Sequence, residues 1–301
     1  MFFILCLNYV FLANILKNEI DMRPNQNFKI VIKLTCILMG LLFLNVPLIS
    51  QMTLKGDANV LLKNDARVEV FGNLKIETSG SLTQENTGSI LLAGNWDNSG
   101  VFDAGTGNVV FNGNLIQYIT GSSETSFYNF LINKSSNNVE LLVSMYIQNH
   151  LQLISETLIK IGNFNITIGI AGNILNNLNQ STWNDFTVAR SIYTNGTGQL
   201  KREVTGTGEK VLVFPISTSG NPTDVYTPAR IVIHNKPGTS YSSGASVGVN
   251  AVPSEHPEVE ETGVALTKYW VVTSPGVTFD TDGSVANMEF KYDQTEVRPD
   301  D

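Results

Sequence analysis

The stretch that decides the fold is GNWDNSGVFDAGTGNVVFNGNLIQYITG, which runs from Gly94 to Gly121. Glycine returns every six or seven residues, usually beside Asn, Ser or Thr, and short apolar runs fill the intervals. Glycine and asparagine tolerate the positive φ that a tight corner demands, and no helical period is present. The stretch therefore predicts short β-strands joined by tight corners.

The same pattern begins upstream, in VEVFGNLKIE at residues 68–77, where apolar and charged residues alternate as in a strand with one buried face. Gly72, Gly94, Gly107 and Gly113 are each followed by Asn, and we expect them to be the structural corners. Hairpin loops prefer the reverse order, Asn-Gly, and longer strands. Three strand-plus-corner units of about seven residues make a coil of about twenty, which is typical of solenoid repeats.

These observations favour an all-β chain with a right-handed β-helix-like solenoid at residues 51–180; an antiparallel sandwich or meander is the alternative. The aromatic residues along it are expected to stack in the core rather than to form sugar platforms: Trp96, Phe102, Phe111, Tyr118 and Phe127. After a polar bridge at residues 180–191, six alternating runs predict an antiparallel β-sandwich-like module at residues 190–301.

Residues 1–50 read as a leader and signal peptide. A basic segment precedes the apolar run Leu34 to Ile49, which is too short to cross a bilayer easily, and cleavage is expected after Ser50. Met22 is an alternative start, and a membrane-anchoring hairpin is the alternative structure. Both cysteines, Cys6 and Cys36, lie in this leader, so the mature chain is expected to lack disulfides, zinc–thiolate sites and cysteine nucleophiles.

Charge excludes some partners. Residues 51–301 hold 15 Lys and Arg against 25 Asp and Glu, a net charge of −10, and they contain no basic run. Such a chain is a poor ligand for nucleic acid or anionic lipid, so we expect membrane contact only through the leader.

Candidate sites are few, and no catalytic residue or cofactor is predicted. Asp280 and Asp282 before Gly283 resemble the start of a calcium loop, although the remaining ligands are lacking and a plain turn is favoured. An acidic segment with one histidine is interpreted as a solvated loop rather than a metal site: Glu255, His256, Glu258, Glu260 and Glu261. Carboxylates that a sugar-cleaving enzyme would need are scattered along the predicted coils: Asp97, Asp103, Glu140 and Glu156.

Several sequence motifs of this chain resemble those of a known group of proteins. GTGNVVFNGNLIQYITGSSETSFYNFLINKS, residues 105–135, is similar to a segment common in large secreted proteins of Bacteroidota. The matching residues are Gly105-Thr106-Gly107, Phe111-Asn112-Gly113, Gln117, Ile119, Gly121 and Phe127-Tyr128-Asn129. Later matches are Phe214-Pro215-Ile216, Tyr226-Thr227-Pro228 and Tyr269-Trp270, with Ser217 in place of a glycine, so the resemblance covers about residues 90–301.

The resemblance implies a surface scaffold exported by type IX secretion, released or held on the outer cell surface. Such proteins usually end in a sorting domain, so a chain that stops at YDQTEVRPDD is expected to be a fragment of a longer product; the alternative is a complete short protein with an exposed edge after Phe290. We therefore expect a non-catalytic, secreted or cell-surface, structural or adhesive module whose partners are surface glycans or other surface proteins. A polysaccharide-binding module or a β-helix carbohydrate-active enzyme is the alternative, and Trp96 and Trp183 exposed on one face would support glycan binding.

Overall fold

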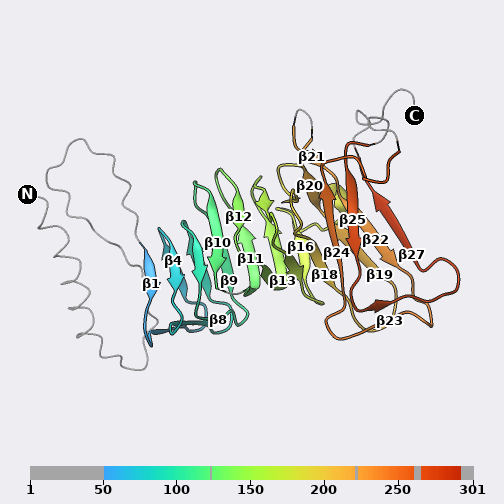
Figure 1. The fold of residues 1–301 in the computed structure, drawn as a ribbon. Helices are drawn as coiled ribbons and strands as arrows, with labels where there is room; N and C mark the ends of the chain where they lie inside the picture. The colour runs from blue at the N-terminus through green and yellow to red at the C-terminus, as the bar shows by residue number, and fades with distance from the viewer. Residues whose placement is uncertain (1–50, 123, 221–222, 261–265, 293–301) are drawn as a thin grey trace, which may run out of the picture. The chain divides into compact units, whose positions relative to one another are not determined.

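The computed structural model describes residues 51–122, 124–220, 223–260 and 266–292 (Figure 1). The leader, with Met22, both cysteines and the cleavage site after Ser50, lies outside the described residues. Within the described part, no helix is long and apolar enough to span a membrane. Its one helix is the 3₁₀ turn η1 (Trp183–Asp185), and every other element is a strand.

The chain winds through three successive strand positions, and each position builds one sheet (Figure 1). Sheet 1 contains β1 (Met52–Leu54), β4 (Leu74–Ile76), β7 (Trp96–Asn98), β10 (Gln117–Gly121), β12 (Val139–Leu141), β14 (Ile159–Lys160), β17 (Ile192–Tyr193), β20 (Ile216–Thr218) and β21 (Val225–Tyr226). Sheet 2 contains β3 (Arg67–Val70), β6 (Ser89–Leu92), β9 (Asn108–Phe111), β11 (Thr125–Ile132), β13 (Met145–Leu153), β15 (Ile166–Ile168), β16 (Asn173–Leu175), β18 (Leu200–Glu203), β24 (Ser246–Val252) and β25 (Tyr269–Thr273). Sheet 3 contains β2 (Asn59–Leu62), β5 (Ser81–Gln84) and β8 (Val101–Asp103).

Parallel pairing with a nearly constant offset defines the solenoid. Met52 pairs with Leu74, and Leu74 pairs with Trp96, so each of these coils takes 22 residues. The parallel ladders form a solenoid of about eight turns between residues 52 and 217. The expected solenoid is therefore confirmed, and the antiparallel alternative is wrong for this part of the chain.

Stacking in register explains why such short strands are stable. Leu74, Trp96 and Ile119 are successive neighbours in sheet 1, and all three are fully buried. Each apolar side chain is covered by the coils before and after it, and burying apolar surface contributes about 25 cal/mol per Å². A three-residue strand thus gains a core that it lacks alone.

The expected aromatic core is largely confirmed. Trp96, Phe111 and Phe127 are fully buried, and Phe102 packs against Trp96 with ring centroids 4.7 Å apart. The expectation was wrong for Tyr118, because this residue alternates with buried neighbours in β10 and lies on the outer face.

The three-strand scheme changes in the middle of the solenoid. Sheet 3 ends at β8, and the long strands β11 and β13 then cover two strand positions each. A bulge after Phe127 bends this pair, and the two halves of β13 pair separately with β15 and β16. One long coil follows, in which Ile159 pairs with Ile192 at an offset of 33 residues. The polar bridge at residues 180–191 belongs to this longer coil, and Phe186 within it is buried.

The parallel arrangement ends at two strands rather than at residue 180. Strand β18 pairs in parallel with β15 and antiparallel with β24, while β20 pairs in parallel with β17 and antiparallel with β21. The ladder thus extends to residue 217, into the expected second module, because alternation shows a buried face but not the direction of a neighbour. Two small antiparallel sheets follow: sheet 4 with β19 (Lys210–Phe214), β22 (Ala229–Ile233) and β27 (Ala286–Phe290), and sheet 5 with β23 (Ser240–Tyr241) and β26 (Val277–Thr278).

The Gly-Asn corners do not work as the sequence suggests. None of the four expected corner glycines adopts a positive φ. Instead, a Cβ on Gly94 would overlap with the backbone carbonyl of Gly72 in the preceding coil, and one on Gly113 would overlap with the carbonyl of Ala93. Glycine is needed here because stacked corners approach closely, a requirement that only the tertiary structure reveals.

The asparagine of the pair supplies the bond between coils. The Asn95 backbone N–H donates to Asn73 Oδ1 at 2.8 Å, and the Tyr118 N–H donates to Asn95 Oδ1 at 2.9 Å. A second amide ladder joins Asn108, Asn129 and Asn149 with 2.9 Å bonds. These bonds satisfy backbone and amide groups at the coil corners and on the outer face of sheet 2.

Candidate functional site

A polar cluster lies on the outer face of sheet 2, where the parallel coils give way to antiparallel pairing. Tyr146 in β13 is opposite Thr167 in β15, and Thr167 is opposite Lys201 in β18. Glu203 follows two residues later on the same face. Coils separated by more than fifty residues of sequence therefore bring a phenol, an amine and a carboxylate together.

A glycine makes the central contact possible. Tyr146 donates a hydrogen bond from its hydroxyl to Glu203 Oε2 at 2.8 Å. The phenol reaches across Gly169, where a Cβ would lie only 2.5 Å from the tyrosine oxygen. A side chain at residue 169 would therefore displace Tyr146 from the carboxylate.

Charge and burial set the protonation of the cluster. The pKa of Tyr146 is raised to about 12 by burial, by its bond to Glu203 and by the nearby negative charges, so the phenol stays a donor at neutral pH. Burial raises the pKa of Glu124, with a further contribution from the charge of Glu203, while Lys201 opposes the shift. The two carboxyl groups and the amine thus share one electrostatic environment.

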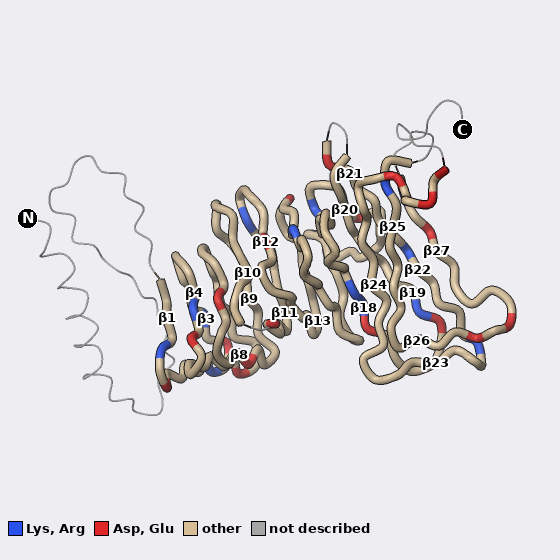
Figure 2. The backbone as a smooth tube through the Cα atoms, viewed as in Figure 1, with Lys and Arg blue, Asp and Glu red and all other residues tan. Residues whose placement is uncertain are grey.

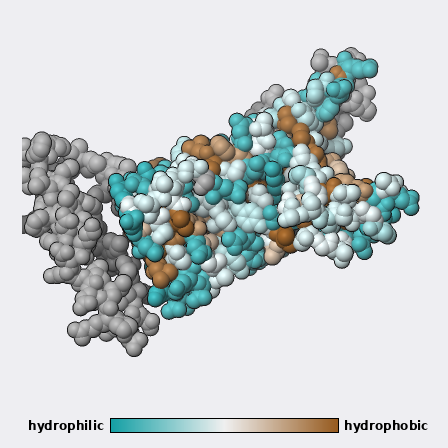
Figure 3. Space-filling model, turned by 60° about the horizontal axis from the view of Figure 1, so that its bottom comes forward, coloured by the Kyte–Doolittle hydropathy of each residue, from teal (hydrophilic) through white to brown (hydrophobic). Residues whose placement is uncertain are grey.

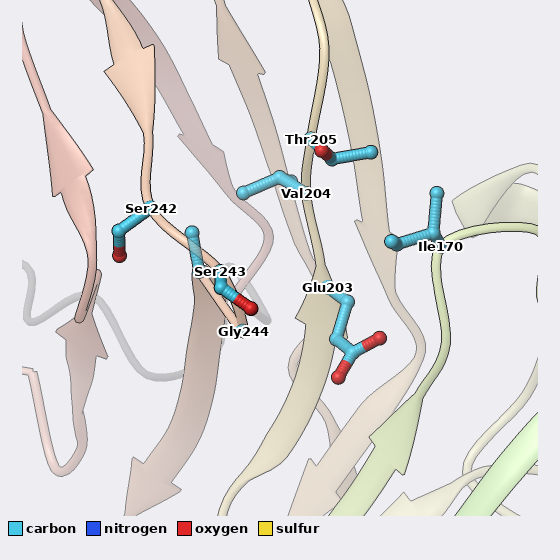
Figure 4. A pocket seen from close by; sticks show the side chains of 8 residues that line it. Ile170, Glu203, Val204, Thr205, Ser242, Ser243 and Gly244 are labelled. Carbon is cyan, nitrogen blue, oxygen red and sulfur yellow. The ribbon is translucent and has the colours of Figure 1, made fainter.

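A cavity of about 360 Å³ adjoins this cluster. It is lined by Ile170, Glu203, Val204, Thr205, Ser242, Ser243, Gly244 and Ala245. Figure 4 shows Glu203 between the turn at Ser242–Gly244 and the side chain of Ile170. Ile170 is 61% exposed, so the cavity combines hydroxyl groups and one carboxylate with an accessible apolar wall.

The residues of the matched motif form a structural network elsewhere in the solenoid. Lys134 is buried, and its Nζ donates to Gly113 O at 2.9 Å, Leu115 O at 2.7 Å and Gln117 Oε1 at 2.8 Å. The Gln117 amide in turn donates to Leu92 O at 2.9 Å. Desolvation lowers the pKa of Lys134 to about 8, although three oxygen acceptors surround the ammonium group. This network ties consecutive coils together.

The weak calcium candidates take part in a turn. Asp280 accepts backbone hydrogen bonds from Gly238 at 2.9 Å and from Asp282 at 3.0 Å, one on each carboxylate oxygen. These bonds lower the pKa of Asp280, the bond from Gly238 most strongly. Both oxygens are therefore engaged by the chain itself, and the calcium assignment remains a prediction.

The acidic loop is organised by its histidine. His256 packs edge-on against Tyr269 with ring centroids 4.9 Å apart, and its Nδ1 accepts the backbone N–H of Glu258 at 3.2 Å. Glu261 lies outside the described residues. Among those that the structure describes, no three His, Cys, Asp or Glu side chains gather as a metal site would require.

The carboxylates considered for sugar cleavage do not gather: Asp97 and Glu140 share sheet 1, but β10 lies between their strands, and the other two lie elsewhere. Asp97 in sheet 1 faces Lys75 at 3.9 Å, and Asp103 in sheet 3 accepts the backbone N–H of Gly105 at 3.1 Å. Glu140 is opposite Lys160 in sheet 1, and Glu156 lies in the turn before β14. Trp96 is fully buried, so the tryptophan pair that a sugar platform would need is not formed.

Charged and apolar residues are distributed along the described chain as follows. Figure 2 shows Lys and Arg interspersed with Asp and Glu along the described chain. On the face shown in Figure 3, hydrophobic residues form small patches separated by hydrophilic ones. The place beside Glu203 combines a cavity with the hydrogen bond between Tyr146 and Glu203, so we treat it as the candidate site.

Sequence reasoning missed the cluster because its members are far apart in the chain. Alternation in YIQNHLQL and LKRE could have shown that Tyr146, Lys201 and Glu203 point outward. Their meeting depends on the coil offsets, which the longer coil changes from about 22 to 33 residues. Comparison of the chain with family models, curated proteins and solved structures finds no match, so its function is argued from its own residues.

Proposed function

We propose that this chain is a non-catalytic structural and adhesive module of a secreted or cell-surface protein. The observation that carries the proposal is the stack of about eight coils at residues 52–217, held by apolar layers and amide ladders rather than by cysteine. A fold of this kind spaces other domains and presents its outer faces, because each coil stacks on the one before it.

The sequence supports the location. A basic segment followed by an apolar run is typical of a secretory signal, and the absence of cysteine from residues 51–301 suits an oxidising exterior. The resemblance to secreted Bacteroidota proteins favours export by type IX secretion. Surface glycans or other surface proteins are the partners that fit an acidic module without a basic tract.

Localisation tests this proposal directly. The complete gene is expressed in a Bacteroidota host with an epitope tag, and the protein is assayed in medium, outer-membrane, periplasmic and cytoplasmic fractions, with protease digestion of intact cells. Export or surface exposure is expected, and loss of the type IX machinery should trap the protein in the periplasm. Retention of the chain in the cytoplasm of normal cells contradicts the proposal.

Glycan binding is the second candidate, and one observation favours it. The cavity beside Glu203 offers hydroxyl groups, a fixed carboxylate and an exposed apolar side chain in one place. Cleavage of glycans has less support, because Asp97, Asp103, Glu140 and Glu156 do not come together.

A further inference from the structure

We infer that the cavity beside Glu203 binds one residue of an uncharged saccharide. The inference specifies the adhesive part of the proposed function and rests on it. Its basis is the combination of a fixed acceptor, adjustable hydroxyl groups and an apolar wall in a cavity of about 360 Å³. This size falls within the range of about 300–1,000 Å³ found for small-molecule sites.

The fixed acceptor is the Glu203 carboxylate. Its Oε2 already accepts the Tyr146 hydroxyl at 2.8 Å, which orients the group and leaves acceptor capacity on both oxygens. Two neighbouring sugar hydroxyls can donate to the two oxygens of one carboxylate. Such charge-assisted hydrogen bonds are roughly twice as strong as neutral ones.

The opposite wall provides hydroxyl groups that both donate and accept. Ser242 and Ser243 lie in an exposed turn, and Gly244 after them has a φ of +74°. Thr205, two residues after Glu203, adds a hydroxyl group on the side of the carboxylate (Figure 4). Serine and threonine hydroxyls rotate to match their partner, so they can read the mixed donors and acceptors of a sugar ring.

The apolar wall is Ile170, which is 61% exposed. Its side chain lies on the other side of Glu203 from the serine turn (Figure 4). One face of a pyranose ring carries C–H groups and gains from covering apolar surface. The cavity therefore matches a ligand that is polar at its edge and apolar on one face.

Charge narrows the ligand class further. Glu124 and Glu203 share this environment, so a uronic acid or sulfated sugar would meet like charge. Lys201 on the same face offsets only one of these two negative charges. A metal ion would need more carboxylate or imidazole ligands than the described residues bring together. We commit to an uncharged saccharide because the hydroxyl groups and the apolar wall fit its ring, while the carboxylates disfavour an anionic one.

The test is calorimetric titration of the purified full-length chain with five hexasaccharides: maltohexaose, cellohexaose, xylohexaose, mannohexaose and chitohexaose. At least one is expected to bind with a Kd on the order of 0.1–1 mM, since one sugar residue in an open site gives few contacts. Oligogalacturonate is the charged control and should not bind. Absence of binding by all five overturns the inference.

Two variants locate the site. Glu203→Gln should weaken binding at least tenfold, whereas Glu140→Gln, which removes the same charge on sheet 1, should leave it unchanged. Ser243→Trp should block the cavity, whereas Ser79→Trp in another exposed turn should not. Unchanged melting curves verify folding, and full binding by both Glu203→Gln and Ser243→Trp overturns the assignment.

The outcomes separate this inference from the proposed function. If the chain is surface-exposed but binds no hexasaccharide, the structural module is supported and the saccharide site is contradicted. If the chain binds a hexasaccharide but stays in the cytoplasm, the site is supported and the surface module is contradicted. New reducing ends during incubation would support the site and overturn the non-catalytic function.

Discussion

The parallel coils and the antiparallel sheets of this chain cover their apolar side chains in different ways. In the solenoid, Phe127 is fully buried because coils lie on both sides of it. In sheet 4, Leu212, Ile231 and Met288 occupy paired positions on three strands, but Met288 on the edge strand is 51% exposed. The stacked coils cover a central side chain from both sides, whereas a short sheet leaves its edge partly uncovered.

The two regions also use glycine for different reasons. Gly94 in the coils is needed because the backbone of Gly72 lies against it, and its φ is ordinary. Gly206, between β18 and β19, has open space around it and a φ of +70°. Close approach governs the repeated corners, and backbone conformation governs this turn between β18 and β19. Four predictions test how the chain is stabilised in the two regions.

The largest expected effect is loss of a stacked aromatic. Phe127→Ala should reduce the free energy of unfolding by about 3–5 kcal/mol, because it leaves a cavity between Trp96 and Phe130. Met288→Ala should cost less than about 1 kcal/mol, since half of that side chain is already exposed. Chemical denaturation of both variants measures the difference. Equal losses would show that the edge of sheet 4 is as well packed as the coils.

Glycine substitutions come next. Gly94→Ala should cost about 3 kcal/mol, because the added Cβ overlaps backbone that cannot move without shifting a coil. Gly206→Ala should cost about 1 kcal/mol through backbone strain alone. Gly206→Asn should recover part of that loss, because asparagine tolerates positive φ, while Gly94→Asn should not. Thermal melting of all four variants is the measurement, and rescue at residue 94 would contradict the close-approach explanation.

The buried lysine makes a pH-dependent prediction. The pKa of Lys134 is about 8 in the folded chain against 10.5 for an ordinary lysine, so above pH 8 the unfolded state binds more protons. Stability should therefore rise by roughly 2 kcal/mol between pH 8 and 10, as the cost of the buried charge disappears. Denaturation at several pH values should show this rise in the native chain and not in Lys134→Met. If the native chain and Lys134→Met lose the same stability between pH 8 and 10, the prediction is contradicted.

The smallest expected effect is at the amide ladder. Asn95→Ala removes the acceptor of the Tyr118 N–H and should cost about 1 kcal/mol. Asn287→Ala, on the exposed strand β27, should change stability by less than about 0.5 kcal/mol. Hydrogen exchange at the Tyr118 amide should accelerate in the first variant alone. No change in that exchange would show that the ladder bond is dispensable.

Much of the solenoid was predictable because its signals are local. Alternation placed Leu74 and Ile76 inward, and the glycine spacing gave a coil close to the observed 22 residues. These local signals do not show which strands pair, so they placed the end of the parallel solenoid near residue 180 instead of at β18 and β20. The prediction of a buried Tyr118 was wrong for a similar reason, since an aromatic residue is expected in the core unless its register in the strand is known.

By itself, the sequence determined that this chain forms short strands with one buried face, joined by tight corners, because these properties depend on side chains a few residues apart. The tertiary structure decided why the corner glycines are required, where parallel pairing ends and which side chains meet around Glu203. Each of these depends on residues twenty or more positions apart lying against one another. Small changes in coil length move such contacts without altering the local pattern.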